Sequence, residues 1–353
     1  MPTSNRVYNT NIISETIIPT PAEVKEQLPL SIQAEATVLD GRSTIQRILD
    51  RQDPRRLLIV GPCSIHNVEL AIDYATRLRR LAREVKDVFV VVMRVYFEKP
   101  RTAIGWKGLI NDPRLDDSFR IDDGLKTARR LLLDLNEMGV PTGTEALDPV
   151  VPQYISDLIS WYAIGARTTE SQTHREIASG LSAPIGFKNG TDGNLDIAVM
   201  ALRAAASPHS FLGVSQDGRS AVFRTRGNRY GHVVLRGGKT PNYQAADIAT
   251  CEQILARNQL PTTLVVDCSH ANSSKDHTRQ PLVFDNCIEQ IQQGNTSIVG
   301  MMLESNIAAG RQDIPQDLTT IKYGVSVTDA CIDWETTERT ILDGAAKIRS
   351  LGA

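Results

Sequence analysis

Four cationic side chains follow an apolar run in the stretch VVVMRVYFEKPRTAIGWKGLINDP, which spans residues 90–113. They are Arg94, Lys99, Arg101 and Lys107. The whole chain carries 39 Lys and Arg against 41 Asp and Glu, which gives a net charge of −2. A positive edge on a nearly neutral protein favours a small anionic ligand over a long polyanion.

Ionisable or metal-binding side chains also stand at the ends of most other strand-like runs. Seven of eight such runs end in this way, with Cys63, Arg94, Glu145, Arg167, Lys188, His270 and Glu304. If the runs form one closed parallel sheet, their carboxyl ends meet at a single rim. We therefore expect all seven side chains to converge on one site.

Three of these residues offer ligand atoms for a divalent metal ion, namely Cys63, His270 and Glu304. Asp329, in the segment YGVSVTDACI, is the best placed by sequence to add a fourth, oxygen donor. Mixed sulfur, nitrogen and oxygen donors suit Mn²⁺, Fe²⁺, Co²⁺ or Zn²⁺ better than Mg²⁺ or Ca²⁺. Taken singly, a Cys at a strand end is more often a small buried hydrophobe, so the metal hypothesis depends on the set.

The second chemical group is cationic. It comprises six residues: Arg94, Lys99, Arg101, Arg167, Lys188 and Arg236. Planar guanidinium groups make two-point contacts with carboxylate and phosphate oxygens. Six cations at one rim therefore predict several anionic groups on the ligands, with more than one phosphate among them.

The elements that position these side chains alternate between strand-like and helical patterns. Residues 69–84 and 123–138 place apolar side chains at helical spacing, and the second pattern stops at Gly139. The strand-like runs are residues 57–64, 90–96, 141–147, 163–168, 184–189, 210–215, 264–270 and 298–305. Continuous apolar strands alternating with helices indicate a parallel sheet buried on both faces.

Eight such units predict an α/β fold, a (β/α)8 TIM barrel with its reactive groups at the strand C-terminal ends. Residues 220–225 and 232–238 are separated by the Gly-rich turn GNRYG, so we expect an inserted hairpin after the sixth strand, within 216–238. An open doubly wound sheet is the alternative, but no GxGxxG follows the first strand. Residues 1–40 read as an N-terminal arm for regulation or oligomerisation, and residues 41–353 as the catalytic barrel.

Composition places the chain among ordinary globular proteins, because 41% of its residues are hydrophobic and 23% are charged. No apolar run is long enough for a membrane span, and the N-terminus lacks the apolar block of a secretory signal. Five Cys without paired spacing do not indicate a disulfide framework. We expect a cytoplasmic protein that binds neither a membrane nor nucleic acid.

Several long motifs resemble those of type I 3-deoxy-D-arabino-heptulosonate-7-phosphate (DAHP) synthases, over roughly residues 20 to 335. The motifs are GPCSIH (61–66), MRVYFEKPRT (93–102), GWKGLINDP (105–113), IGARTTESQ (164–172), GFKNGTDG (186–193), RGGK (236–239), DCSHANS (267–273) and YGVSVTDAC (323–331). The resemblance implies condensation of phosphoenolpyruvate with erythrose 4-phosphate and release of phosphate, the first step of the shikimate pathway. Two phosphates and a carboxylate would then account for the cations.

The resemblance also implies roles for individual residues. Phosphoenolpyruvate would be bound by Arg94, Lys99, Ala166, Arg167, Lys188 and Arg236. Erythrose 4-phosphate would be bound by Lys99, Pro100, Arg101, Thr102 and Asp329. The divalent metal would be held by Cys63, His270, Glu304 and Asp329, and the catalytic residues would be Lys99, Glu145 and His270.

Feedback inhibition is a further implication. The stretches TEALDP (144–149), FLGV (211–214), ESNI (304–307) and GVSVTDACI (324–332) resemble the tyrosine-sensitive branch of the family. The implied effector pocket contains Pro149, Gln153, Ser182, Phe211, Gly213 and Val214, with Asn9 from another subunit's arm. Phenylalanine-sensitive relatives tend to carry Ser at Gly213, and Gly leaves room for the tyrosine hydroxyl. The arm has too little core to fold alone, so we expect a homodimer or homotetramer.

Three alternatives stay open at this point. A related sugar-acid synthase would use arabinose 5-phosphate, although the motif KPRT (99–102) favours erythrose 4-phosphate. A metal-dependent class II aldolase would not need phosphoenolpyruvate. A non-catalytic protein could bind anionic metabolites or RNA through the same cations, without metal dependence or phosphate release.

Overall fold

Eight parallel strands form a closed barrel in the computed structural model, which describes residues 7–101 and 105–351. Around the barrel the order is β1-β10-β9-β8-β5-β4-β3-β2, back to β1. The strands are β1 (Arg56–Gly61), β2 (Phe89–Arg94), β3 (Thr142–Glu145), β4 (Trp161–Ile164), β5 (Ile185–Lys188), β8 (Gly231–Leu235), β9 (Leu264–Asp267) and β10 (Ile298–Glu304). The predicted (β/α)8 barrel is confirmed.

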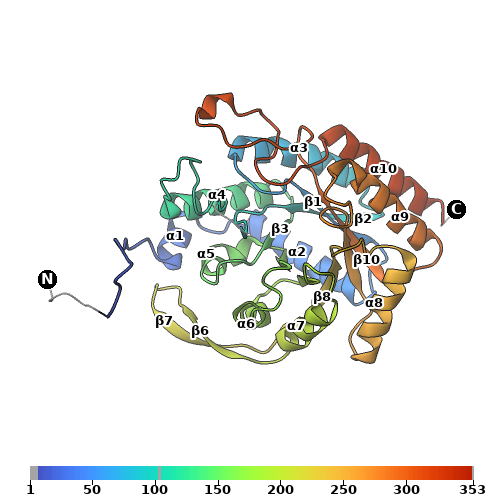
Figure 1. Cartoon of the computed structure of the whole chain (residues 1–353), viewed down its shortest axis with the longest axis horizontal. Helices are drawn as coiled ribbons and strands as arrows, with labels where there is room; N and C mark the ends of the chain where they lie inside the picture. Colours follow the sequence, from blue (N-terminus) through green and yellow to red (C-terminus); the bar gives the residue numbers. More distant parts are fainter. Residues whose placement is uncertain (1–6, 102–104, 352–353) are drawn as a thin grey trace.

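A helix follows each barrel strand and covers the outside of the barrel (Figure 1). These helices are α3 (Val68–Glu84), α4 (Ile121–Glu137), α5 (Val151–Ile155), α6 (Gln172–Gly180), α7 (Asp196–Ala206), α8 (Ala245–Arg257), α9 (Gln280–Gln292) and α10 (Trp334–Arg349). Three single turns are 3₁₀ helices: η1 (Ser156–Leu158), η2 (His277–Arg279) and η3 (Leu318–Thr320). The two helical patterns predicted at 69–84 and 123–138 correspond to α3 and α4.

Apolar side chains fill the barrel in two layers. One buried cluster lies between the strands and the outer helices. A second lies inside the barrel and includes Leu57, Val92, Trp161 and Val234. Side chains that alternate between these two layers explain why the strands read as continuous apolar runs rather than as alternating ones.

Two helices precede the barrel, α1 (Pro21–Gln27) and α2 (Ile32–Leu49). The C-terminal part of α2 adds Ile45 and Ile48 to the inner cluster. Helix α2 therefore crosses residue 40, where the sequence-based division places the end of the arm. Residues 7–17 are exposed and extend away from the barrel in Figure 1. None of the helices in the described residues has both the length and the apolar character that a bilayer span requires.

The assignment of the inserted hairpin was wrong. Strands β6 (Ser210–Val214) and β7 (Ser220–Arg224) form a separate antiparallel pair, which lies before the sixth barrel strand rather than after it. Residues 232–235 instead belong to β8, which pairs in parallel with β5 and β9, and residues 236–238 follow it as a loop. Burial gives the reason. Strand β8 is buried over four consecutive residues, whereas every residue of β6 remains at least partly exposed.

Candidate active site

The carboxyl ends of the barrel strands surround a cavity of about 270 Å³. It is lined by Arg94, Tyr96, Lys99, Pro100, Arg101, Glu145, Gly165, Ala166, Arg167, Lys188, Thr191, Arg236, His270 and Asp329. These residues come from the ends of β2, β3 and β5 and from the loops that follow β2, β4, β5, β8, β9 and β10. The structure thus brings the two predicted chemical groups, cations and metal donors, to one mouth.

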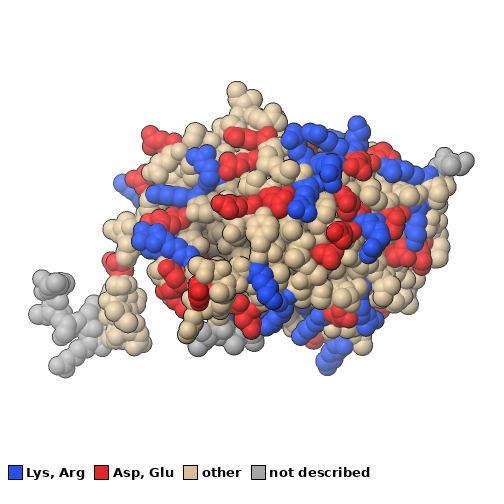
Figure 2. Space-filling model, turned by 90° about the horizontal axis from the view of Figure 1, so that it is seen from above, with Lys and Arg blue, Asp and Glu red and all other residues tan. Residues whose placement is uncertain are grey.

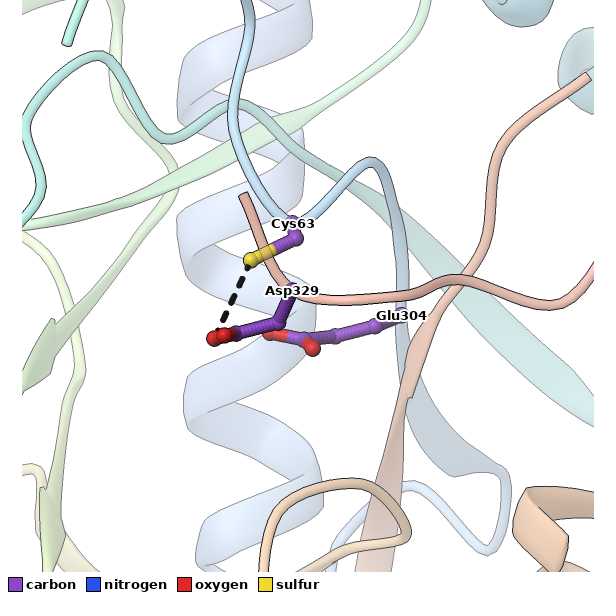
Figure 3. Close-up of side chains that lie close together, drawn as sticks. All are labelled: Cys63, Glu304 and Asp329. Atoms are coloured by element: carbon purple, nitrogen blue, oxygen red, sulfur yellow. Dashed lines mark hydrogen bonds between the residues drawn. The ribbon is translucent and has the colours of Figure 1, made fainter. Parts of the chain in front are cut away.

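Three of the four proposed metal ligands form a compact cluster. One ligand atom from each of Cys63, Glu304 and Asp329 lies within 4.8 Å of the other two. Cys63 follows β1, Glu304 is the last residue of β10, and Asp329 lies in the loop before α10 (Figure 3). Sγ of Cys63 lies 3.6 Å from Oδ2 of Asp329.

His270 adjoins this cluster from the loop after β9. Its Nε2 lies 3.8 Å from Oε1 of Glu304. The backbone of His270 has a φ of 57°, a left-handed conformation that is uncommon for residues other than Gly. This conformation turns the chain sharply after β9, and Asn272 and Ser273 hold the turn through bonds to Asp267 O and His270 O.

The donor set fits a divalent transition metal. A sulfur, an imidazole nitrogen and two carboxylates are ligand types for Mn²⁺, Fe²⁺, Co²⁺ or Zn²⁺. Oε1 of Glu304 is buried, and its ion pair with a terminal nitrogen of Arg94 at 2.8 Å lacks the alignment of a hydrogen bond. Burial, and after it the charge of Glu304, raises the pKa of the Cys63 thiol, so a cation is needed to favour the thiolate.

Arg94 is the most deeply buried of the predicted anion-binding cations, with 1% of its side chain exposed. Its Nε donates to Pro62 O at 3.1 Å, and one terminal nitrogen donates to Cys63 O at 3.1 Å. The guanidinium carbon lies 3.5 Å from the centre of the Tyr96 ring. These contacts fix the guanidinium plane beside the metal-donor cluster.

Lys99 connects the two groups directly. Its Nζ lies 3.1 Å from Sγ of Cys63 and 3.4 Å from Cys63 O. Burial by itself would lower the pKa of Lys99, but Cys63 and Glu304 hold it above its ordinary value. The ammonium group is therefore charged and lies where an anionic substrate would enter.

Lys188 and Arg236 line another part of the wall. Nζ of Lys188 donates to Oδ2 of Asp267 at 2.7 Å, and both side chains are almost fully buried. The backbone N–H of Arg236 donates to Oδ1 of Asn189. Burial lowers the pKa of Arg236 from its ordinary value, although a guanidinium remains charged in proteins.

Glu145 is the predicted catalytic carboxylate. Its Oε1 is buried and has no hydrogen-bond partner among the described residues. A Cβ added at Gly165 would approach this oxygen to 2.2 Å, so Gly165 leaves the space that Glu145 occupies. An unpartnered carboxylate oxygen beside the cavity is available to a ligand or to water.

Of the residues expected to bind the sugar phosphate, Lys99, Pro100, Arg101 and Asp329 line the cavity. Thr102 lies outside the described residues. Arg101 and Arg167 are exposed at the mouth, and Ala166 lines the cavity beside Arg167.

Sequence reasoning missed four residues of the site: Tyr96, Gly165, Thr191 and Asp267. Asp267 carried the clearest signal, because a carboxylate inside the apolar run LVVDCSH needs buried partners. Burial would raise the pKa of Asp267, but His270 and Lys188 hold it well below its usual range. Tyr96 is the last residue of the strand-like run 90–96, and its position there predicts no chemical role.

A second cavity of about 550 Å³ lies between α5, α6 and the β6-β7 pair. Its lining includes Pro149, Gln153, Ser182, Phe211, Gly213 and Val214, the six residues expected from one subunit at an effector site. The rings of Phe211 and Phe223 stack at a centroid distance of 5.8 Å. Asn9 lies in the extended arm, where it is exposed, and it does not line the cavity of its own chain.

Acidic and basic side chains are interspersed over the face shown in Figure 2. A nucleic-acid binding surface usually carries a continuous basic stripe. Among the described residues, six Lys and Arg side chains line the mouth of the barrel.

Comparison with known proteins gives consistent matches. The family model described as the DAHP synthetase I family matches residues 27–341. The Tyr-sensitive phospho-2-dehydro-3-deoxyheptonate aldolase of Escherichia coli K12 is 57% identical over 330 residues, which cover 94% of this chain and 93% of that protein. The tyrosine-inhibited enzyme of Schizosaccharomyces pombe is 50% identical over 335 residues, covering 93% of this chain and 90% of that protein.

A solved structure agrees with these sequences. The structure of phospho-2-dehydro-3-deoxyheptonate aldolase from Francisella tularensis SCHU S4 superposes with a TM-score of 0.94. The two chains are 46% identical, and the match covers 96% of this chain and 99% of the other.

Proposed function

The chain belongs to the DAHP synthetase I family, and from this premise we propose that its barrel mouth joins phosphoenolpyruvate to D-erythrose 4-phosphate. The products are DAHP and inorganic phosphate, so the enzyme is a transferase (EC 2.5.1.54) of the first step of the shikimate pathway. The observation that carries the proposal is the contact between Nζ of Lys99 and Sγ of Cys63. It places the cations that line the cavity directly beside the metal-donor cluster.

Phosphoenolpyruvate carries a phosphate and a carboxylate on adjacent atoms. Arg94 and Lys188 are held rigidly on the wall by backbone and carboxylate partners, so they offer fixed positive charge. Arg167, Arg236 and the backbone of Ala166 complete the set that we assign to this substrate. Preorganised cations of this kind stabilise developing charge without reorganising during the reaction.

We assign erythrose 4-phosphate to the outer part of the mouth. Arg101 is exposed there and can reach the sugar phosphate, while Lys99 and Asp329 lie toward the aldehyde end. Pro100 and Thr102 complete the KPRT motif.

Cys63, His270, Glu304 and Asp329 are the residues that would hold the divalent metal, Mn²⁺, Fe²⁺, Co²⁺ or Zn²⁺. A metal bound there supplies Lewis-acid polarisation of the aldehyde carbonyl. The catalytic role that we assign to His270 is therefore to bind this metal. The mixed sulfur, nitrogen and oxygen donors suit each of these four ions better than Mg²⁺ or Ca²⁺.

The chain's own residues account for the remaining steps. C3 of phosphoenolpyruvate forms a bond to the aldehyde carbon, and Lys99 donates a proton to the alkoxide that develops there. The π electrons of the double bond form the new bond, which leaves positive charge at C2. Glu145, with its free Oε1, orients a water that adds there and accepts one of its protons. The resulting phosphohemiketal breaks its C2–O bond to phosphate, while its C2 hydroxyl passes its proton to the departing phosphate and becomes the ketone. Arg167 and Arg236 bind the departing anion.

Regulation and assembly form the second part of the proposal. We assign tyrosine to the cavity between α5, α6 and the β6-β7 pair, where Gly213 leaves space beside the Phe211 and Phe223 rings. Residues 1–40 would act as an arm that places Asn9 in another subunit's cavity, within a homodimer or homotetramer. Residues 41–353 would form the catalytic barrel.

The proposed location is the cytoplasm. All five cysteines are unpaired and buried, as expected of a protein in a reducing compartment.

The test measures phosphate released from phosphoenolpyruvate by the full-length protein. We expect release only with erythrose 4-phosphate present, loss of release with a chelator, and recovery when Mn²⁺ or Co²⁺ is added. Tyrosine should inhibit and phenylalanine should not. Phosphate release without the sugar, or with arabinose 5-phosphate in its place, would contradict the assignment.

A further inference from the structure

The buried carboxylate of Asp267 lies between two parts of the site that the proposed mechanism treats separately. It is the last residue of β9 and is 1% exposed. Nζ of Lys188 lies 2.7 Å from its Oδ2, and Nδ1 of His270 lies 2.9 Å from the same oxygen. One carboxylate oxygen therefore contacts both a substrate-binding cation and a metal ligand.

The other oxygen of Asp267 is also occupied. Oδ1 accepts from the Ser269 backbone N–H at 3.1 Å and from the Ser269 hydroxyl at 2.7 Å. The Ser269 hydroxyl lies 2.6 Å from Nδ1 of His270. Because the hydroxyl donates to Asp267, it accepts from His270, and both contacts place the imidazole proton on Nδ1.

This arrangement leaves the lone pair of Nε2 free, and Nε2 is the ring nitrogen on the side of Glu304. Histidines that bind metals commonly donate their other N–H to a carboxylate, which fixes the tautomer and the ring orientation. On the opposite side, the same carboxylate fixes the position of the Lys188 ammonium within the cavity wall.

We propose that Asp267 is a shared positioning residue, which aims Nε2 of His270 at the metal and Nζ of Lys188 at phosphoenolpyruvate. This inference rests on the proposed function, since it takes both ligands from it. Asp267 itself does not line the cavity, so it acts through its two partners rather than by touching substrate.

Replacement of Asp267 by Asn has a clear stereochemical consequence. The amide keeps the shape of the carboxylate but offers only one acceptor oxygen. If its NH₂ group faces Lys188 and His270, it meets two donors. If the amide turns over, the NH₂ group meets the Ser269 N–H. No orientation of Asn satisfies all the donors that surround Asp267.

The test measures two binding equilibria on metal-free full-length protein. Co²⁺ is titrated and followed by absorbance, with the thiolate band of Cys63 as the signature of correct ligation. Phosphoenolpyruvate is titrated separately by calorimetry. For Asp267→Asn we expect Co²⁺ binding 10- to 100-fold weaker and phosphoenolpyruvate binding at least tenfold weaker. The control is Asp285→Asn, because Asp285 is a partly exposed residue that pairs with Lys347 and lies outside the cavity lining.

Affinities of Asp267→Asn within twofold of wild type for both ligands would overturn the proposal. Loss of affinity for only one ligand would overturn the shared role. Failure of the wild-type protein to bind Co²⁺ and phosphoenolpyruvate would instead contradict the proposed function, so the two failures are distinguishable.

If Asp267→Asn does not fold, a pair of variants replaces it. Lys188→Met removes the buried cation, and Asp267→Asn in that background no longer leaves Lys188 without a partner. We expect the double variant to bind Co²⁺ at least tenfold more weakly than Lys188→Met alone. Equal Co²⁺ affinity of these two proteins would overturn the proposal.

Discussion

The guanidinium of Arg94 lies 2.8 Å from Oε1 of Glu304, and the two side chains are only 1% and 3% exposed. The pair joins the wall that we assign to phosphoenolpyruvate to the metal-donor cluster. If one partner of this buried pair is removed, the other charge is left buried without compensation, and the folded state loses stability.

We expect Arg94→Met to lower the free energy of unfolding of the metal-free protein by about 3–5 kcal/mol, because Glu304 is left buried without its partner. Urea denaturation measures the change. Arg80→Met serves as the control, because its ion pair with Glu338 is at the surface and should contribute at most about 1 kcal/mol. Equal losses of unfolding free energy in the two variants would show that the buried pair stabilises the protein no more than the surface pair does.

Cys63→Ala should abolish metal-dependent turnover while the barrel stays folded. The replacement removes the one sulfur of the donor cluster but leaves the strands that surround it unchanged. Metal content after dialysis, phosphate release and circular dichroism provide the measurements. Cys251→Ala, at a buried position in α8, controls for loss of a thiol elsewhere. Normal metal content and activity in Cys63→Ala would refute the ligand assignment.

The sequence predicted the barrel because its signals are local. Each parallel strand is buried on both faces, so it reads as an apolar run, and α4 ends at Glu137, just before Gly139 and Pro141. The hairpin was misassigned because residues 210–214 are as apolar in composition as a barrel strand. Only the tertiary structure shows Leu212 to be exposed, whereas Val233 and Val234 are buried.

The site residues that end a barrel strand could be predicted from the sequence, because the carboxyl ends of all the strands lie at one rim. Arg94, Glu145, Lys188 and Glu304 are the last residues of their strands. The role of Asp267 could not be read in the same way, because its contact with His270 depends on the left-handed turn after β9. Sequence spacing does not reveal that turn, since residues other than Gly seldom adopt it.

Gly213→Ser should weaken inhibition by tyrosine. A Cβ at this position would come within 2.9 Å of the Phe223 ring, so the ring must shift within the cavity that we assign to the effector. Steric changes of this size alter binding by about 10- to 200-fold. The measurement is the tyrosine inhibition constant, with turnover in the absence of tyrosine unchanged. Val222→Ala, on the exposed face of β7, is the control, and an unaltered constant in Gly213→Ser would place the effector elsewhere.

Glu98 should make the protein less stable as the pH rises. It is 5% exposed, and burial, followed by the charge of Asp148, raises its pKa to about 8 from 4.5. The unfolded chain releases this proton near pH 4.5, so stability is lost between about pH 4.5 and 8. Glu98→Gln avoids the loss, and we expect it to exceed wild type at pH 8 by on the order of 4 kcal/mol.

Urea denaturation at pH 5 and pH 8 tests this difference. The gain from Glu98→Gln should be small at pH 5 and largest at pH 8. Glu26→Gln, at an exposed position of α1, serves as the control. A gain in Glu98→Gln that did not change with pH would show that packing, rather than ionisation, is responsible.

His232 should have the opposite effect and destabilise the protein in acid. It is 1% exposed, and its Nε2 accepts a hydrogen bond from Nε1 of Trp161 at 3.2 Å. Burial lowers the pKa of His232 to about 4 from 6.5. The unfolded chain binds the proton first as the pH falls, so stability is full above about pH 6.5 and declines toward pH 4.

His232→Gln keeps an acceptor for Trp161 but does not titrate in this range, so its unfolding free energy should fall less between pH 7 and pH 4.5. The expected difference in slope corresponds to about 3 kcal/mol over that interval. Part of the slope will remain, because burial also lowers the pKa of His66 to about 4. Parallel stability curves for wild type and His232→Gln, with His277→Gln as control, would show that His232 is not protonated on unfolding.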